Sequence, residues 1–279
     1  MEIRLAVLGT AMLCVASNAN AANPCNPNAT VQARNVLEYV SSLSGESSNK
    51  VISGQQLGDA IAGVAGYGDY VLKLQKETGK WIGMIGSDYC YPDQVVPSTI
   101  SALNRILIDY WDAGGLVTIS IHAGNPNGGD VTNTNRANIN DIVNSSTAVG
   151  KAWMSDLIRV ADGLEELRDA GVVVLWRPFH EMNGGWFWWP DIPADWKKLW
   201  NHMFDYFTND RELNNLLWVF APFVNNKPAS FYPGDNRCDI VGVDYYGTTF
   251  DISGDYTAMT ALGKPFGLTE WGVHYLGGD

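Results

Sequence analysis

The sequence predicts an α/β protein that folds as a (β/α)8 TIM barrel. Its 279 residues suit a single barrel, a fold that typically has about 250 residues. Short apolar runs alternate with amphipathic stretches, which is the pattern of βα units. Each run leads into polar or aromatic residues. Polar residues at the C-terminal ends of consecutive strands favour a barrel, in which all these ends line the active-site face. In a doubly wound sheet, the ligand site lies only where the strand order reverses.

Seven apolar runs account for the predicted strands. They lie at residues 51–53, 81–86, 116–121, 172–176, 216–220, 239–243 and 265–268. The stretches between them predict helices at 57–76, 97–112, 152–169, 193–208 and 254–262. A (β/α)8 barrel needs an eighth strand, and the long interval 123–171 has the composition of a polar loop and one helix. We therefore expect a single domain over residues 22–279 that is C-terminally incomplete and lacks its last βα unit. The alternative is a strand that the pattern does not reveal.

Residues 1–21 have the features of a secretory signal peptide. Arg4 supplies a positive charge, Leu5–Val15 is an apolar segment, and Ala19–Ala21 fits a cleavage site with small residues. The apolar segment is too short to span a membrane. We expect a secreted protein, extracellular or periplasmic, after cleavage near Ala21. The alternative is a buried N-terminal helix.

The cysteine content allows one disulfide at most in the mature chain. Cys14 belongs to the predicted signal peptide, which leaves Cys25, Cys90 and Cys238. Their wide spacing fits no zinc site. We expect one disulfide and one free thiol, and the sequence leaves the pairing open.

The formal net charge of −12 at pH 7 limits the classes of partner. Nucleic acids and anionic membrane surfaces are bound through basic patches, so the charge argues against both. An acidic surface is compatible with an uncharged ligand. We therefore expect a monomer whose partner is a neutral polysaccharide.

Two glutamates follow strands that a barrel brings to one face. Glu181 comes after the fourth predicted strand and Glu270 after the seventh. Such a pair suits glycoside hydrolysis, in which one carboxyl protonates the leaving oxygen and the other attacks the anomeric carbon if they are about 5–5.5 Å apart. A glutamate beside Trp rings loses hydration, which raises its pKa and keeps a proton available. The alternative is that either glutamate pairs with a Lys or Arg in the surface layer.

Aromatic and histidine side chains lie close to Glu181 in the sequence. Trp186, Trp188 and Trp189 follow it, and indoles stack on the C–H faces of pyranose rings. We expect at least one of the three to bind sugar, with Trp186 and Trp189 as the candidates. Core packing is the alternative. His122 and His180 are predicted to bind a sugar hydroxyl or to orient a carboxylate, with a structural role as the alternative.

Asp244 and Tyr246 end the sixth predicted strand. A Tyr hydroxyl can donate to Glu270 and keep it ionised, and the alternative is a Tyr at the barrel rim. Other chemistries have weaker support. His180 and the glutamate after it begin like a zinc-binding H-E-x-x-H motif, but Gly184 stands at the position of the second His. The chain has no G-x-S-x-G motif, and its 4 His residues form no clear metal set.

Several of these motifs resemble glycoside hydrolase family 26, whose members are mostly β-mannanases. Arg177–Trp189, with the sequence RPFHEMNGGWFWW, resembles the acid/base motif of the family. Leu268–Gly272, LTEWG, resembles its nucleophile motif. Gly114–His122 with the Asn-Pro pair that follows, and Val243–Gly247, fit the same pattern. The resemblance runs from near Thr30 to the end of the sequence.

The resemblance implies a (β/α)8 barrel and a retaining double displacement without a metal or other cofactor. By position, Glu181 would be the acid/base and Glu270 the nucleophile, with Tyr246 holding Glu270. The side chains implied to contact sugar or to line the cleft are His122, His180, Trp186, Asp88 and Phe223. This sequence departs from the family in two places. Ile121 stands where relatives often carry Trp, and nothing after Trp271 supplies the Trp that the family's eighth strand brings to the subsite next to the scissile bond.

The resemblance therefore predicts a secreted endo-β-1,4-mannanase that cuts mannan, galactomannan or glucomannan. A mixed-linkage β-glucanase or a β-1,3-xylanase is the alternative within the family, because the same two glutamates serve all three. Two further alternatives belong to other classes. A non-catalytic carbohydrate-binding remnant would bind sugar without hydrolysing it, and a metallohydrolase would lose its activity to a chelator.

Overall fold

The computed structural model describes residues 23–43, 50–89, 96–225, 227–247 and 251–272. The predicted signal peptide, residues 1–21, and Cys90 lie outside these ranges. Within them, no helix combines the length and the apolar character that a membrane span requires.

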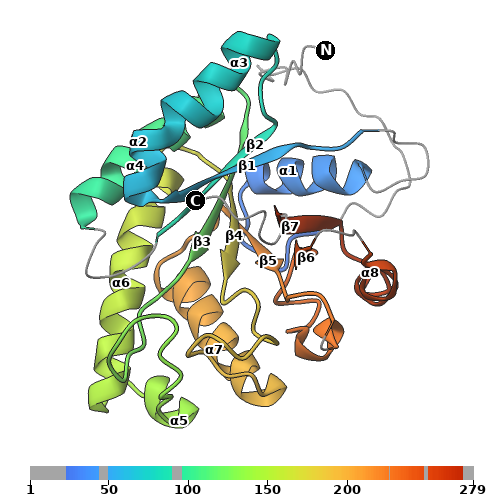
Figure 1. The fold of residues 1–279 in the computed structure, drawn as a ribbon. Coiled ribbons are helices and arrows are strands. Elements are labelled where there is room, and N and C mark those ends of the chain that lie inside the picture. The colour runs from blue at the N-terminus through green and yellow to red at the C-terminus, as the bar shows by residue number, and fades with distance from the viewer. Residues whose placement is uncertain (1–22, 44–49, 90–95, 226, 248–250, 273–279) are drawn as a thin grey trace.

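Seven parallel strands form one curled sheet (Figure 1). Their order in the sheet is their order in the chain, so each strand pairs with the next. The strands are β1 (Gly54–Asp59), β2 (Met84–Asp88), β3 (Leu116–Ile121), β4 (Val174–Pro178), β5 (Leu216–Phe220), β6 (Ile240–Tyr246) and β7 (Phe266–Gly272). Sequential parallel strands joined by helices are the arrangement of a TIM barrel. The predicted fold class is therefore confirmed, with β1 and β7 at the two ends of the order.

Helices connect the strands and cover the outside of the sheet (Figure 1). The α-helices are α1 (Val31–Ser42), α2 (Ala60–Tyr67), α3 (Lys73–Thr78), α4 (Pro97–Asp112), α5 (Ile139–Ile142), α6 (Ala148–Asp169), α7 (Pro193–Asp205) and α8 (Ser253–Thr260). Two π-helical turns, η1 (Gly68–Leu72) and η2 (Tyr206–Asp210), and a 3-10 turn, η3 (Pro228–Phe231), are the other helical elements of the described residues. Proline starts both α4 and α7, a position where its missing N–H costs no helical hydrogen bond.

The predicted strand positions hold best at the centre of the sheet. The bounds of β3 and β5 are those expected from the apolar runs. The first strand begins at Gly54, later than the predicted start at Val51. The Ser53 carbonyl accepts from the backbone of Gly83 and Met84, and pairing with β2 starts only at the next residue. An edge strand is defined by its pairing more than by its apolar content.

The apolar centre of the sheet is buried on both faces. Every residue of β4 and β5 is buried. Trp176 and Trp218 occupy paired positions on these two strands and are fully buried. Strands that are buried on both faces consist of continuous apolar residues, so their positions could be predicted well from the sequence.

Helix α1, which was not predicted, packs at the amino ends of the strands. Its residues Ala33, Val36 and Leu37 form a second apolar cluster with residues of β3, β4, β5 and β6. Thr30 caps the helix and donates its backbone N–H to Asn214 ahead of β5. This face of the barrel is therefore occupied by the N-terminal segment, and the opposite, carboxyl-end face is left for a site.

The predicted disulfide is wrong. Cys25 and Cys238 are both free thiols, and every pair among the three candidate cysteines includes one of them. The Cys25 thiol donates to the Asp239 carboxylate at 3.2 Å, and the Cys238 thiol donates to the Ile240 carbonyl at 3.1 Å. Each sulfur therefore has its own oxygen partner. Burial raises the pKa of both thiols, which keeps them protonated.

Candidate active site

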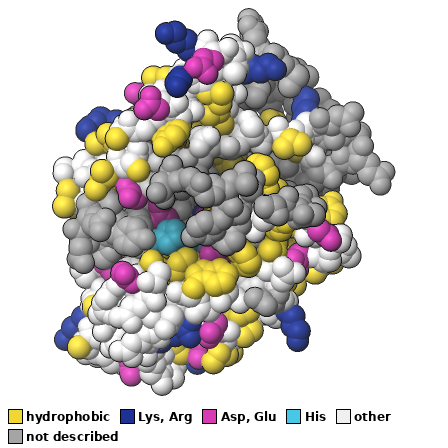
Figure 2. Space-filling model, in the orientation of Figure 1, with side chains coloured by type: hydrophobic (Ala, Val, Ile, Leu, Met, Phe, Trp, Pro, Cys, Tyr) yellow, Lys and Arg dark blue, Asp and Glu magenta, His cyan; other side chains and the backbone are white. Residues whose placement is uncertain are grey.

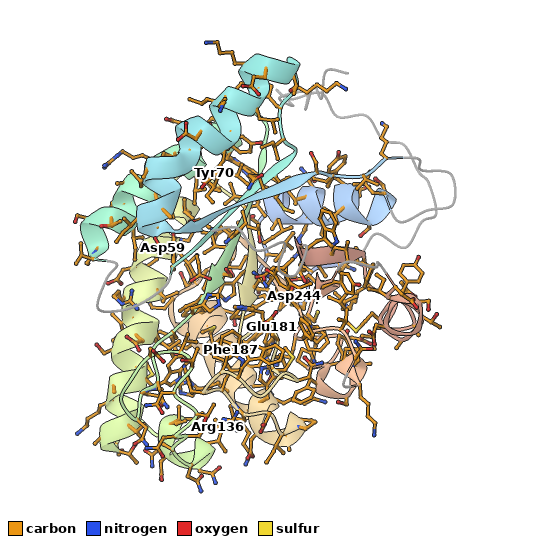
Figure 3. All side chains as sticks on the ribbon, viewed as in Figure 1. Asp59, Tyr70, Arg136, Glu181, Phe187 and Asp244 are labelled. Atoms are coloured by element: carbon orange, nitrogen blue, oxygen red, sulfur yellow. The ribbon has the colours of Figure 1, made fainter. Side chains whose placement is uncertain are left out.

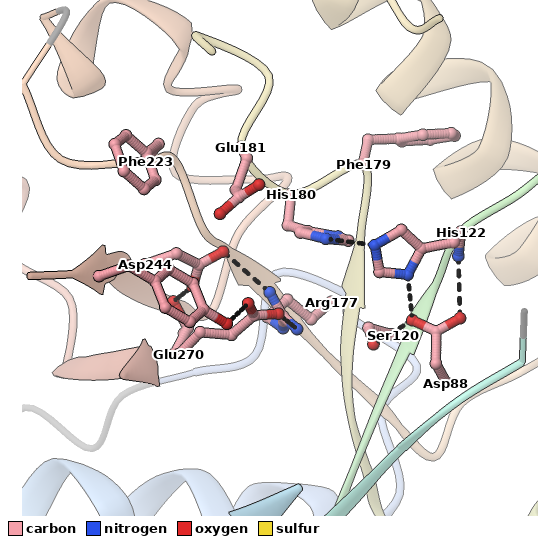
Figure 4. A network of polar contacts seen from close by, with 12 residues as sticks. Asp88, Ser120, His122, Arg177, Phe179, His180, Glu181, Phe223, Asp244 and Glu270 are labelled. Carbon is pink, nitrogen blue, oxygen red and sulfur yellow. Dashed lines mark hydrogen bonds and ion pairs between the residues drawn. The ribbon is translucent and has the colours of Figure 1, made fainter. Parts of the chain in front are cut away.

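Polar side chains from the carboxyl ends of several strands meet in one network (Figure 4). Figure 3 places Asp244 and Glu181 beside each other near the middle of the molecule. In the space-filling view, a histidine and acidic side chains lie in a hollow of this face, bordered by hydrophobic ones (Figure 2). The network comes from the ends of β2, β3, β4, β6 and β7 and consists of Asp88, His122, Arg177, His180, Glu181, Asp244, Tyr246 and Glu270.

Glu181 is placed by a strained turn after β4. The backbone of Phe179 has φ 49° and that of Glu181 has φ 52°, a left-handed region that side-chain-bearing residues seldom adopt. The turn is held because the Glu181 N–H donates to the Ala221 carbonyl at 2.8 Å, just after β5. The Glu181 carbonyl in turn accepts from Gly184 at 2.9 Å. Strain of this kind persists where the surroundings fix a side chain for function.

Three carboxylates converge in this cleft. Glu181, Asp244 and Glu270 each place one oxygen within 4.8 Å of the others. They come from the turn after β4 and from strands β6 and β7. The predicted meeting of Glu181 and Glu270 in one cleft is therefore observed, and Asp244 is a third acid beside them.

Glu270 is surrounded by donors that favour its ionised form. Arg177 donates from Nη2 to one carboxylate oxygen, and the Tyr246 hydroxyl donates to the other at 2.6 Å. Burial raises the pKa of Glu270, but the positive charge of Arg177 and the two hydrogen bonds outweigh it. The pKa is therefore lowered, and the carboxylate is charged. The predicted contact between Tyr246 and Glu270 is present.

The pKa of Glu181 is shifted in the opposite direction. Its side chain is buried, and burial raises its pKa above the ordinary glutamate value. The negative charge of Glu270 raises it further, while the hydrogen bond from Trp186 Nε1 at 2.8 Å opposes the shift without cancelling it. The two glutamates thus have pKa values displaced in opposite directions by their surroundings, the pattern that assigns acid and base roles in a shared site.

Arg177 is a residue of this site that the sequence analysis did not assign. It is buried at the end of β4 and pairs with both Asp244, at 3.0 Å, and Glu270. Thr269 donates its hydroxyl to the other Asp244 oxygen. Burial raises the pKa of Asp244 well above its usual range in spite of Arg177. An Arg that directly follows the apolar run Val172–Trp176 was the available signal, because a buried strand end tolerates a cation only beside an anion.

Asp88 and His180, predicted for the cleft wall and for a sugar contact, are buried and linked through His122. Asp88 accepts from the backbone N–H of His122 at 2.9 Å and lies 2.8 Å from its Nδ1. Nε2 of His122 lies 3.1 Å from Nε2 of His180, which is only 1% exposed. Burial lowers the pKa of His180, and the nearby charges of Arg177 and His122 lower it further. Both side chains are buried. That His180 contacts sugar and that Asp88 lines the cleft stay predictions.

The three tryptophans after Glu181 separate into two groups. Trp186 is 38% exposed and meets the ring of Phe223 edge-on at 5.1 Å. Trp188 and Trp189 are fully buried, and their indole N–H groups donate to the carbonyls of Ala123 and His180. Trp186 can therefore face a ligand, and Phe223 supports it. The Trp189 ring belongs to the core beneath the site, and its contact with sugar stays a prediction.

Comparison with known proteins agrees with this geometry. The family model of glycosyl hydrolase family 26 matches residues 25–274. This chain belongs to glycosyl hydrolase family 26. It is 37% identical over 283 residues to a protein named mannan endo-1,4-beta-mannosidase A and B from Caldalkalibacillus mannanilyticus, covering 93% of this chain. The chain spans 54% of the length of that relative.

Solved structures of mannanases share the fold. A Bacillus subtilis mannanase has a TM-score of 0.78 and 33% identity, over 90% of this chain and 80% of that one. A β-mannanase from a symbiotic protist of the termite Reticulitermes speratus, complexed with gluco-manno-oligosaccharide, has a TM-score of 0.75 and 30% identity, over 90% and 82% of the two chains. The family membership and the barrel fold that the motifs predicted are both confirmed.

The core role of Trp189 gives a prediction about stability. In this family 26 protein the ring packs 4.3 Å from that of Phe187 and 5.9 Å from that of Phe179. Replacing Trp189 by alanine should lower the free energy of unfolding by about 3–5 kcal/mol, the cost of deleting a large buried aromatic. Chemical denaturation measures this loss. An unchanged unfolding midpoint with a large rise in KM would instead indicate that Trp189 contacts sugar.

Proposed function

We propose that this chain is an endo-β-1,4-mannanase that cleaves internal linkages of mannan-type polysaccharides with retention of configuration. Glu181 is the acid/base and Glu270 the nucleophile. The observation that carries the proposal is the pair itself: their oxygens lie within 4.8 Å, and their pKa values are shifted in opposite directions. Inverting enzymes need roughly 6.5–9.5 Å between carboxyl groups to admit a water, whereas retaining enzymes need about 5–5.5 Å.

In the first step, the charged Glu270 attacks the anomeric carbon while Glu181 gives its proton to the glycosidic oxygen. The C–O bond breaks, the shortened polysaccharide leaves as an alcohol, and the sugar is covalently bound to Glu270. The Tyr246 hydroxyl and Arg177 keep the Glu270 carboxylate charged and oriented before the attack.

In the second step, Glu181 takes a proton from water as the water displaces Glu270. The charge on Glu270 contributes to the raised pKa of Glu181. Because the ester to sugar has no charge, that contribution disappears in the intermediate, and the pKa of Glu181 falls when it must act as a base. The same side chain therefore serves both steps.

The substrate class rests on relatives. Proteins named mannan endo-1,4-beta-mannosidase match this chain over most of its length, and the complex with gluco-manno-oligosaccharide has the same fold. The discriminating assay compares release of reducing ends from mannan, mixed-linkage β-glucan and β-1,3-xylan. We expect mannan to be preferred. Preference for either other polysaccharide would overturn the substrate assignment, and binding without hydrolysis of any would overturn the enzymatic one.

We propose that the reaction runs without a metal ion. Among the described residues, the group of acids that could ligate one is Glu181, Asp244 and Glu270. The guanidinium of Arg177 pairs with two of these three, so a positive charge already occupies the place where a cation would bind. Activity should be unchanged after treatment with a chelator, and loss of activity restored by a divalent ion would contradict this.

We also propose that the protein is secreted and acts as a monomer. Residues 1–21 carry the signal-peptide pattern given above. Determining the N-terminus of the mature protein from the culture medium tests the cleavage near Ala21, and scattering-based mass measurement tests the monomer. An N-terminus at Met1 on cell-associated protein would contradict secretion.

The opposed pKa shifts predict a bell-shaped dependence of kcat/KM on pH. Activity falls at low pH as Glu270 gains a proton, and it falls at high pH as Glu181 loses one. The Tyr246→Phe variant removes a hydrogen bond that lowers the pKa of Glu270. Its acid limb should therefore move to higher pH and narrow the bell. An acid limb that stays in place would show that this hydroxyl does not set the ionisation of Glu270.

A further inference from the structure

Trp186, the indole that donates to Glu181, has an exposed face, so its position must be fixed by its neighbours. One neighbour is Gly184: a Cβ at this glycine would come within 2.2 Å of the indole ring, which therefore lies directly over it. The other is Phe223, whose ring stands at 86° to the indole with 5.1 Å between centroids. The ring is thus held from below by Gly184 and at its edge by Phe223.

Asn183 ties the loop that carries Phe223 to the turn that carries Glu181. Its Oδ1 accepts from the Phe223 N–H at 2.8 Å, and its Nδ2 donates to the Phe223 carbonyl at 2.7 Å. The same Nδ2 donates to the Asn225 carbonyl at 3.1 Å. A planar amide that fills both its acceptor and its donor functions on one stretch of backbone fixes the orientation of that stretch.

The loop after β5 is also held by other elements, and Phe223 itself pairs with Asp244 of β6. Asn225 and Lys227 have φ values of 63° and 54°, so its backbone is strained. It is held from the α8 side, where Asp255 accepts from the Asn225 N–H at 2.7 Å. From the β6 side, the Val224 N–H donates to the Asp244 carbonyl. Asn183 supplies the side-chain connection toward Glu181.

We propose that Asn183 is a positioning residue for the acid/base. Its amide fixes the Phe223 backbone through hydrogen bonds, which form a clamp. The Phe223 ring packs against the Trp186 indole, and this contact keeps the indole N–H hydrogen-bonded to the Glu181 carboxylate. The inference rests on the proposed function, because it takes Glu181 to be the acid/base. Asn183 itself acts only through Phe223 and Trp186.

The effect of the clamp is separable from the other charges around Glu181. The Trp186 hydrogen bond lowers the pKa of Glu181 against the effect of burial. The charged and titratable groups that face Glu181 come from the ends of β3, β4, β6 and β7, and are His122, Arg177, Asp244, Tyr246 and Glu270. None of these side chains contacts the Asn183 amide in its three hydrogen bonds. The side-chain path from Asn183 to Glu181 therefore runs through Phe223 and the indole, without a direct contact to these charges.

The test is a double-mutant cycle between Asn183→Ala and Trp186→Phe, read as the alkaline limb of kcat/KM against pH. Trp186→Phe keeps an aromatic ring and removes the N–H, so the limb should move to higher pH. Asn183→Ala should also displace the limb and lower kcat. In the double variant the two shifts should not add, because both act on one hydrogen bond. An unmoved limb in Asn183→Ala, or shifts that add, would overturn the proposal.

Two further variants keep the test decisive. Gly184→Ala displaces the indole from the opposite side and should move the alkaline limb even if Asn183→Ala does not fold; an unmoved limb in folded Gly184→Ala would count against the proposal. Asn140→Ala, which removes an exposed amide bonded to Lys198, should leave the limb and kcat unchanged. If Glu181→Gln retained full activity, the proposed function would fail; if it is inactive while the limb of Asn183→Ala is unmoved, only the clamp fails.

Discussion

Replacing Glu270 by glutamine is expected to lower kcat/KM on mannan by about 10⁴-fold or more. Losses of this size are typical when an enzyme loses a residue that forms or activates its nucleophile. Glutamine has the same shape and can still accept from Tyr246. It has no negative charge, so it cannot form the ester to the anomeric carbon. It also leaves the buried Arg177 with one charged partner fewer.

The measurement is release of reducing ends from mannan, with circular dichroism to show that the variant is folded. A matched control is Glu38→Gln, the same change at an exposed position of α1. The control should keep full activity. If folded Glu270→Gln retained a tenth of the activity or more, Glu270 would not be the nucleophile.

Replacing Glu181 by alanine is expected to lower the hydrolysis rate by different factors for substrates with different leaving groups. Hydrolysis of mannan should fall by about 10²–10⁴-fold, the usual contribution of a general acid. A mannoside with a nitrophenolate leaving group needs little protonation, so its first step should remain fast. The second step then lacks its base, and the sugar should accumulate as an ester on Glu270.

Mass spectrometry of the peptide that contains Glu270 detects this intermediate. Added azide should speed turnover, because it needs no base: it attacks the anomeric carbon, displaces the Glu270 carboxylate and leaves as a β-glycosyl azide. Equal losses on both substrates, with no rescue by azide, would mean that Glu181 contributes something other than proton transfer.

The elements of the site that could be predicted from the sequence are those defined by position along a strand. Glu181 and Glu270 follow apolar runs, and parallel strands carry their carboxyl ends to one face. The contact between Tyr246 and Glu270 was predictable for the same reason, because the two residues end neighbouring strands and lie near the same edge.

Depth below the surface could not be predicted in this way. Asp88, His180 and Trp189 lie in the right segments but one layer beneath the cleft. Sequence position orders residues along a strand or turn, but it does not reveal a left-handed backbone such as that at Phe179 and Glu181, which redirects the side chains of the turn after β4. The fourth predicted strand ends at Trp176, one residue before Arg177, so the pattern did not place Arg177 in the site.

Attack by Glu270 with Glu181 as its proton donor is the central step of the proposed reaction, and the anomer first released tests it directly. Proton NMR can follow hydrolysis of a β-1,4-manno-oligosaccharide from its first minutes, before mutarotation mixes the anomers. The double displacement predicts that the new reducing end appears first as the β-anomer and that the α-anomer grows in later. Initial release of the α-anomer would contradict the account, because it requires water to attack directly and leaves Glu270 with no covalent role.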